Sequence, residues 1–267
     1  MSGLASTTYG ESGPRIVLLH GLFGQGRNFT GVAKALSTGA RVTVVDLPDH
    51  GRSPWSTTFS YAAAADAVAQ QLVDLAPGET WTVVGHSMGG KVAMLVALRH
   101  PALVSRLVVV DIAPGTSTAV SSFGTYVDAL RAVDLDALTE RSAADRAVAA
   151  QVPDPAVRGF LLQNLRRDAT GGPDGAARWR WQMNLALLGD QLDDVAGWPE
   201  GDLGTYAGPV LWVAGADSAY VQPEAEPAMR ALFPRVRAVR IKGAGHWVHA
   251  DQPEVFVATL RRFLEAV

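Results

Sequence analysis

The chain has 267 residues, with 23 Lys and Arg against 26 Asp and Glu for a net charge of −3, and it contains no Cys. The missing Cys excludes disulfide scaffolds, Cys-ligated zinc or iron–sulfur sites and cysteine nucleophiles. The near-neutral charge offers no broad basic surface for nucleic acid. At 48% hydrophobic and 18% charged residues, the composition is that of a folded globular protein of one or two domains.

The N-terminal segment lacks the basic and apolar regions of a signal peptide, which predicts a cytoplasmic protein. The longest apolar runs, Val92–Leu98 and Leu107–Val110, are far shorter than the roughly 18 residues that indicate a membrane span. We therefore expect no membrane span.

Short β-branched runs alternate along the chain with Ala- and Leu-rich segments of helical periodicity. The predicted strands, apolar on both faces, are Ile16–Leu19, Val42–Val45, Trp81–Val84, Leu107–Val110, Val210–Val213 and Val236–Ile241. The predicted helices between and after them are Asn28–Leu36, Tyr61–Leu75, Gly89–Arg99, Glu224–Phe233 and Glu254–Ala266. Continuously apolar strands separated by helices predict an α/β fold, with a mostly parallel sheet and helices on both faces.

One long interval, from about Gly115 to Tyr206, contains no clear strand pattern, and its sequence predicts helices. We predict a helical cap over residues 115–207, inserted into a core formed by residues 1–114 and 208–267. Aromatic and Met side chains at helical spacing belong to a core more often than to a pocket. The insertion is nevertheless long enough to cover a substrate pocket. The residues predicted to line that pocket are Tyr126, Trp179, Trp181 and Met183 from the insertion, with Phe23 and Trp247 from the core.

The sequence Gly85-His86-Ser87-Met88-Gly89 is a G-x-S-x-G motif between a predicted strand and a predicted helix. A lone match arises easily by chance in a Gly-rich chain, so the strand-turn-helix context carries the argument. In that context the tight turn presents the Ser87 hydroxyl at the carboxyl edge of the sheet. We predict that Ser87 is a nucleophile rather than an idle serine in a Gly-rich turn.

A serine nucleophile needs a base and an acid that orients the base. His246 follows the last predicted strand and so lies at the same sheet edge as Ser87, which makes it the predicted base. The other histidines are interpreted as structural, and His249 forms an H-x-x-H spacing that lacks a third metal ligand. Asp111, at the end of its strand, and Asp217, in the turn after the insertion, are both candidates for the acid.

The oxyanion of acyl transfer needs backbone N–H donors. Met88 follows the nucleophile and begins a helix, and the second donor is expected from the turn after the first strong strand, at Leu22 or alternatively Phe23. A phosphate-binding role for the glycine-rich stretch 21–26 is disfavoured, because it has neither a G-x-G-x-x-G motif nor a P-loop Lys.

Several separated segments resemble serine hydrolases of the α/β-hydrolase superfamily in order and spacing. They are His20-Gly21, Asp46-Leu47-Pro48-Asp49-His50-Gly51-Arg52-Ser53, Gly85–Gly89 and Gly245-His246-Trp247. Closer similarity to the YbfF-type esterase branch lies in Leu22-Phe23-Gly24, Asp111-Ile112-Ala113-Pro114 and Gly245-His246-Trp247-Val248-His249-Ala250. That resemblance implies hydrolysis of a small-molecule carboxylester, a cytoplasmic setting and no cofactor. It also favours Asp111, because Asp217 stands one residue before the superfamily's usual acid position.

The leading hypothesis is hydrolysis of small to medium acyl esters through an acyl-enzyme. Ser87 argues against epoxide hydrolysis and dehalogenation, whose relatives on this fold use an Asp nucleophile. The same triad also serves thioesterases, lactonases, perhydrolases, C–C hydrolases and lyases, and a ligand-binding receptor on this fold is a further alternative. The sequence does not predict an oligomeric state.

Overall fold

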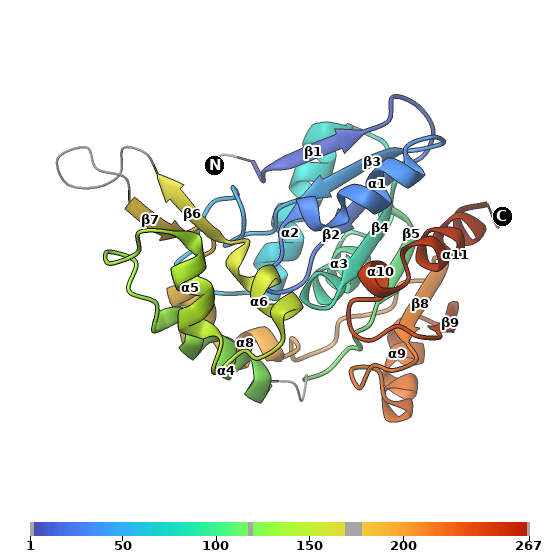
Figure 1. The fold of residues 1–267 in the computed structure, drawn as a ribbon. Coiled ribbons are helices and arrows are strands. Elements are labelled where there is room, and N and C mark those ends of the chain that lie inside the picture. Colours follow the sequence, from blue (N-terminus) through green and yellow to red (C-terminus); the bar gives the residue numbers. More distant parts are fainter. Residues whose placement is uncertain (1–2, 117–119, 169–177, 266–267) are drawn as a thin grey trace.

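A seven-stranded sheet forms the centre of the computed structural model, which describes residues 3–116, 120–168 and 178–265 (Figure 1). The strand order is β1-β3-β2-β4-β5-β8-β9; β1 pairs antiparallel with β3, and the other neighbouring pairs are parallel. The strands are β1 (Ser6–Tyr9), β2 (Arg15–Leu19), β3 (Arg41–Val45), β4 (Trp81–His86), β5 (Val104–Val110), β8 (Val210–Gly215) and β9 (Val236–Ile241). The predicted α/β fold is confirmed.

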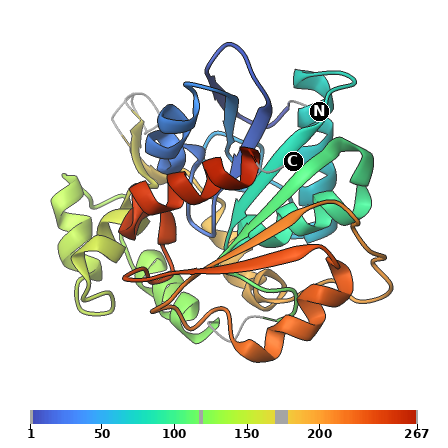
Figure 2. The ribbon, with the colours of Figure 1, turned by 90° about the vertical axis from the view of Figure 1, so that its right-hand side faces the viewer.

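Helices pack on both faces of this sheet (Figure 2). The helices of the sheet core are α1 (Thr30–Leu36), α2 (Tyr61–Leu75), α3 (Met88–Arg99), α9 (Glu226–Leu232), α10 (Val248–Asp251) and α11 (Pro253–Glu265). Side chains alternate along β2, so Ile16 and Leu18 join the core under α1 and α11, whereas Val17 and Leu19 join the core under α2 and α3.

The two edge strands differ from the sequence-based expectation. Strand β1 is short and polar, and half of it is exposed, so its sequence gave no strand signal. Strand β9 was expected to be apolar on both faces, but its four central residues are exposed and include Arg237 and Arg240. Because an edge strand is covered less completely than a central one, it accommodates such charges.

The inserted segment is not wholly helical. It contains α4 (Val120–Arg131), α5 (Arg141–Val148), α6 (Pro155–Leu162), α7 (Leu185–Asp190) and α8 (Leu192–Ala196), together with two strands, β6 (Leu165–Asp168) and β7 (Arg178–Trp181). These strands pair antiparallel, which corrects the expectation of an interval without strands. The sequence Arg-Trp-Arg-Trp of β7 alternates polar and apolar residues with the period of a strand. The segment lies to one side of the sheet (Figure 1), and its role as a cap over residues 115–207 stays a prediction.

Parallel pairing brings the carboxyl ends of the central strands to one edge. Strand β4 ends at His86, which lies opposite Val110 at the end of β5. The next residues, Ser87 and Asp111, therefore leave the sheet side by side. His246 follows β9, whose carboxyl end lies at the same edge.

Candidate active site

The turn that carries Ser87 is sharply strained. Ser87 has φ 54° and ψ −123°, a left-handed conformation that non-glycine residues rarely adopt. A Cβ added at Gly85 would lie 2.1 Å from the Gly89 carbonyl oxygen, and one at Gly89 would lie 2.4 Å from the His20 carbonyl oxygen. The turn therefore needs both glycines of the G-x-S-x-G motif, and it presents Ser87 at the start of α3.

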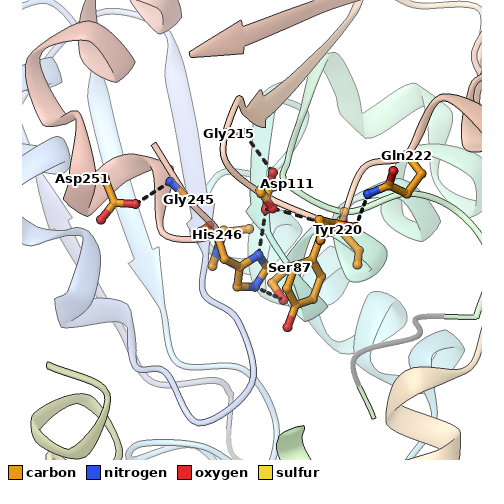
Figure 3. A network of polar contacts seen from close by, with 12 residues as sticks. Ser87, Asp111, Gly215, Tyr220, Gln222, Gly245, His246 and Asp251 are labelled. Carbon is orange, nitrogen blue, oxygen red and sulfur yellow. Dashed lines mark hydrogen bonds and ion pairs between the residues drawn. The ribbon is translucent and has the colours of Figure 1, made fainter. Parts of the chain in front are cut away.

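Ser87, His246 and Asp111 form one hydrogen-bonded chain (Figure 3). His246 Nε2 lies 3.0 Å from Ser87 Oγ, and His246 Nδ1 lies 2.8 Å from Asp111 Oδ2. An ionised carboxylate only accepts hydrogen bonds, so the imidazole proton sits on Nδ1 and leaves Nε2 to accept from the serine hydroxyl. The Gly245 N–H donates to Asp251 Oδ2 at 2.8 Å, which anchors the loop that carries His246.

The structure places Asp111, and not Asp217, against His246. Asp111 is fully buried, and its Oδ1 accepts the Gly215 N–H at 2.9 Å. Its Oδ2 also accepts a hydrogen bond from the Ser218 hydroxyl. With His246 this makes three donors around one carboxylate, which compensates the cost of its burial. Asp217 is exposed, two residues after the buried end of β8 at Gly215.

The rings of Tyr220 and His86 also contact His246, and neither contact was predicted. The Tyr220 ring stacks on the His246 imidazole with centroids 3.7 Å apart and planes 16° apart (Figure 3). His86 Nε2 donates to the His246 carbonyl oxygen at 2.8 Å. Burial raises the pKa of Tyr220 to about 12, and burial lowers the pKa of His86 well below its usual value, so both rings are neutral near pH 7.

The backbone donors beside Ser87 can be told apart by their partners. The Phe23 N–H donates to His50 Nε2 at 3.2 Å, so it is already engaged. Among the described residues, neither the Leu22 N–H nor the Met88 N–H has a hydrogen-bond partner. Met88 is the first residue of α3, where helical N–H groups have no partner within the helix. This geometry favours Leu22 over Phe23 as the donor that accompanies Met88.

The chain matches a known protein family over most of its length. A model of the family described as alpha/beta hydrolase fold matches residues 14–253. The chain belongs to this family.

Individual relatives agree with that assignment. The sn-1-specific diacylglycerol lipase ABHD11 of Mus musculus is 41% identical over 260 residues, covering 94% of this chain and 81% of that protein. Esterase YbfF of Escherichia coli is 34% identical over 255 residues, covering 93% of this chain and 92% of that protein, which confirms the expected resemblance. A solved marine microorganism esterase has a TM-score of 0.92 at 31% identity, over 98% of this chain and 99% of that one. Together they support a hydrolase that acts on esters.

In this α/β hydrolase, Ser87 lies in the walls of two mostly apolar cavities. The apolar walls of the first include Phe23, Phe29, Tyr126, Val157, Phe160, Leu161 and Trp247. Those of the second include Leu22, Tyr61, Met88, Ile112, Leu192, Val195 and Tyr220. Of the six pocket candidates from the sequence, Phe23, Tyr126 and Trp247 line the first cavity.

The other three candidates lie away from both cavities. Trp181 is 8% exposed and Met183 is fully buried, and both belong to the hydrophobic core. Trp179 is partly buried against that core. The sequence-based placement assumed a helix here, whereas Trp179 and Trp181 alternate along strand β7. Their spacing therefore directs them into the packing of the hairpin instead of toward Ser87.

We expect Trp181→Ala to change stability more than substrate choice. Removing a buried Trp side chain leaves a cavity and typically costs about 3–5 kcal/mol of unfolding free energy. Phe160→Ala is the matched variant, because Phe160 is partly buried and its ring lies 5.5 Å from that of Trp247 in the first cavity. Its preference among acyl chain lengths should shift while its melting temperature changes less. If Trp181→Ala changed the preference for acyl chain length and Phe160→Ala did not, Trp181 would be assigned to the substrate pocket.

Lys91 is a buried charge that the sequence analysis did not single out. Its side chain is 1% exposed, and Nζ donates to the carbonyl oxygens of Ala196 and Gly197 at 2.6 Å each. Burial lowers the pKa of Lys91 to about 8. The two bonds tie α3, directly after Ser87, to the end of α8 in the insertion. A lysine on an apolar helix gave no sequence signal for this contact.

The metal alternative finds no support in the described residues, where no group of three or more His, Cys, Asp or Glu side chains is placed to hold an ion. His249 instead packs its ring between Phe29 and His86, with centroids 4.4 and 4.9 Å away. Within the same described part of the chain, no helix combines the length and apolar character needed to cross a membrane.

Proposed function

We propose that this protein is a serine-dependent carboxylester hydrolase that acts on small to medium acyl esters through an acyl-enzyme. The observation that carries the proposal is the chain of hydrogen bonds from Ser87 Oγ through His246 to the buried Asp111. The two mostly apolar cavities that Ser87 lines support acyl and alcohol groups of modest size. The relatives named as esterases and as a lipase support ester substrates.

In the acylation half of the reaction, Ser87 Oγ attacks the ester carbonyl carbon and passes its proton to His246 Nε2. Asp111 stabilises the imidazolium that forms. The carbonyl oxygen becomes an oxyanion, which accepts hydrogen bonds from the N–H groups of Leu22 and Met88 in this proposal. When the tetrahedral intermediate collapses, the bond to the alcohol oxygen breaks, and His246 returns its proton to that leaving group.

Deacylation repeats these steps with water as the nucleophile. His246 Nε2 takes a proton from the water as its oxygen attacks the acyl carbon, and then gives that proton back to Ser87 Oγ. The carboxylic acid leaves and the free serine is restored. We also propose residues 115–207 as the cap, because its side chains supply walls to both cavities at Ser87.

Labelling with a fluorophosphonate tests the nucleophile directly. We expect one label per chain at neutral pH, together with turnover of p-nitrophenyl butyrate without added metal or nucleotide. Ser87→Ala should lose both signals. Ser12→Ala is the matched control, because Ser12 is exposed in the loop before β2, and it should keep both. An unlabelled wild-type protein would favour a receptor, and a label that persists in Ser87→Ala would assign the nucleophile elsewhere.

A further inference from the structure

A separate cavity of about 260 Å³ lies where the sheet core meets the β6–β7 hairpin. Its walls come from β1, from the short helix η1 (Gly26–Phe29), from β3 and the loop after it, and from the hairpin with the residue that follows it. Ser87, Asp111 and His246 do not line it. The charged residues in its walls are Arg27, Asp46, Arg52 and Arg166.

The charge of this cavity is unbalanced. Both oxygens of Asp46 already accept backbone N–H groups, Oδ1 from Gly26 at 2.7 Å and Oδ2 from Arg52 at 2.9 Å. Among the residues that the structure describes, no carboxylate oxygen lies within 4.0 Å of the guanidinium nitrogens of Arg27, Arg52 or Arg166. Three positive charges face one negative charge, which leaves two positive charges uncompensated.

Burial and neighbouring positive charges lower the pKa of two of these arginines. Burial, followed by the charge of Arg141, lowers the pKa of Arg27, and the charge of Asp46 offsets part of that shift. Burial also lowers the pKa of Arg166, and the charges of Arg27, Arg141 and Arg180 lower it further. A bound anion would relieve this repulsion.

Most of the guanidinium donors in the walls are unused. Each guanidinium carries five N–H donors. Arg27 donates from Nη2 to the Gln163 carbonyl oxygen at 2.9 Å, and Arg166 donates from Nε to Gln182 Oε1 at 2.6 Å. The Arg52 side chain has no hydrogen-bond partner among the described residues. The cavity thus presents three sets of open donors around one small space.

We propose that this cavity binds a phosphate dianion, either inorganic phosphate or the phosphate group of a small phosphomonoester. Guanidinium groups match phosphate oxygens in pairs, and a dianion matches the two uncompensated positive charges. The cavity volume of about 260 Å³ lies below the range of about 300–1,000 Å³ for drug-sized ligands, so the ligand is small.

A ligand here would bridge the core and the inserted segment. Arg27 and Arg52 belong to the core, whereas Arg166 lies on β6. The same junction contains Gln25, which donates to Asn164 Oδ1 at 2.6 Å, and Asn164, which donates to the Phe23 carbonyl oxygen at 2.7 Å. Phosphate should therefore stabilise the contact between the inserted segment and the loop that carries Leu22. The folded state should then become more stable as phosphate is added.

Thermal unfolding with increasing inorganic phosphate tests the site, with sodium chloride at equal ionic strength as the reference. We expect a saturable rise in melting temperature of about 3 °C at ten times the dissociation constant. Arg52→Gln and Arg166→Gln should each weaken phosphate binding about tenfold or more in calorimetric titration. Arg237→Gln is the matched control, because Arg237 is exposed on β9 at the far edge of the sheet.

The outcome separates the two phosphate sources and does not depend on ester turnover. Tighter binding of glycerol 3-phosphate than of inorganic phosphate would identify a phosphomonoester site, and equal or weaker binding would identify a site for free phosphate. An equal rise in melting temperature with chloride, or unchanged phosphate affinity in both cavity variants, would overturn the proposal. The variants without phosphate should melt within a few degrees of wild type, since Arg52 is exposed and Arg166 partly so.

Discussion

Asp111→Asn is expected to lower kcat for ester hydrolysis by about 10⁴, whereas Asp217→Asn should change it little. The carboxylate accepts from His246 Nδ1 at 2.8 Å and so keeps the proton on that nitrogen. An Asn amide can donate instead, which favours the tautomer with its proton on Nε2, facing Ser87. That imidazole cannot accept the serine proton, and the imidazolium also loses its counter-charge.

The fold should tolerate Asp111→Asn, so a loss of kcat in this variant can be attributed to the chemistry. Asp111 has φ 52°, a conformation that Asn adopts more readily than most residues. Melting curves of both variants, measured beside kcat for p-nitrophenyl butyrate, separate a chemical defect from misfolding. A large loss in folded Asp217→Asn with a small loss in Asp111→Asn would transfer the role of the acid to Asp217.

The sequence identified the parts of this site that depend on local geometry. The Ser87 turn needs glycines at two fixed positions because of backbone contacts within one strand-turn-helix unit, so its motif is visible in the chain. His246 could be placed because parallel strands end at a common edge. The sequence did not decide whether Asp111 or Asp217 is the acid, because a shift of one position at a strand end redirects the side chain. The structure brings Asp111 to His246 and leaves Asp217 exposed.

Features produced by packing between distant segments had no such signature. Tyr220 stacks on His246, and Lys91 reaches the carbonyl oxygens at the end of α8, and neither contact follows from the spacing of residues. Trp181 and Met183 were misplaced for a related reason. The insertion was expected to be helical, whereas Trp179 and Trp181 alternate with arginines along β7, and a spacing of two residues is the period of a strand.

Mild acid is expected to destabilise the protein strongly, because four histidines are held in the neutral state by burial. His20, His50 and His86 are at most 3% exposed, and His249 is partly buried. Burial lowers the pKa of His20 to about 3 and that of His249 to about 4, and it also lowers the pKa of His50 and, further, of His86. In the unfolded chain each imidazole titrates near pH 6.5. Below pH 6.5 the unfolded state therefore binds more protons than the folded state, so stability is lost as the pH falls.

The contacts of two of these rings explain why protonation is so unfavourable. His20 Nε2 accepts the Leu47 N–H at 3.0 Å while its Nδ1 donates to the Gly21 carbonyl oxygen at 2.8 Å. His50 Nε2 accepts the Phe23 N–H, and its Nδ1 donates to the Pro48 carbonyl oxygen. A second proton on either ring would sit on Nε2 and point at an N–H donor. It would therefore break the bonds that hold the loop around Leu22.

Urea unfolding at pH 7, 6 and 5 measures the effect. Each of these histidines contributes up to about 1.4 kcal/mol per pH unit, so the four together lower the unfolding free energy by up to about 6 kcal/mol per unit. That is a large share of the roughly 5–15 kcal/mol typical of folded proteins, and most carboxylates stay ionised above pH 5. His50→Gln should reduce the slope by about a quarter, because it removes one of the four histidines. A wild-type unfolding free energy that is constant from pH 7 to pH 5 would show that these histidines are protonated in the folded protein.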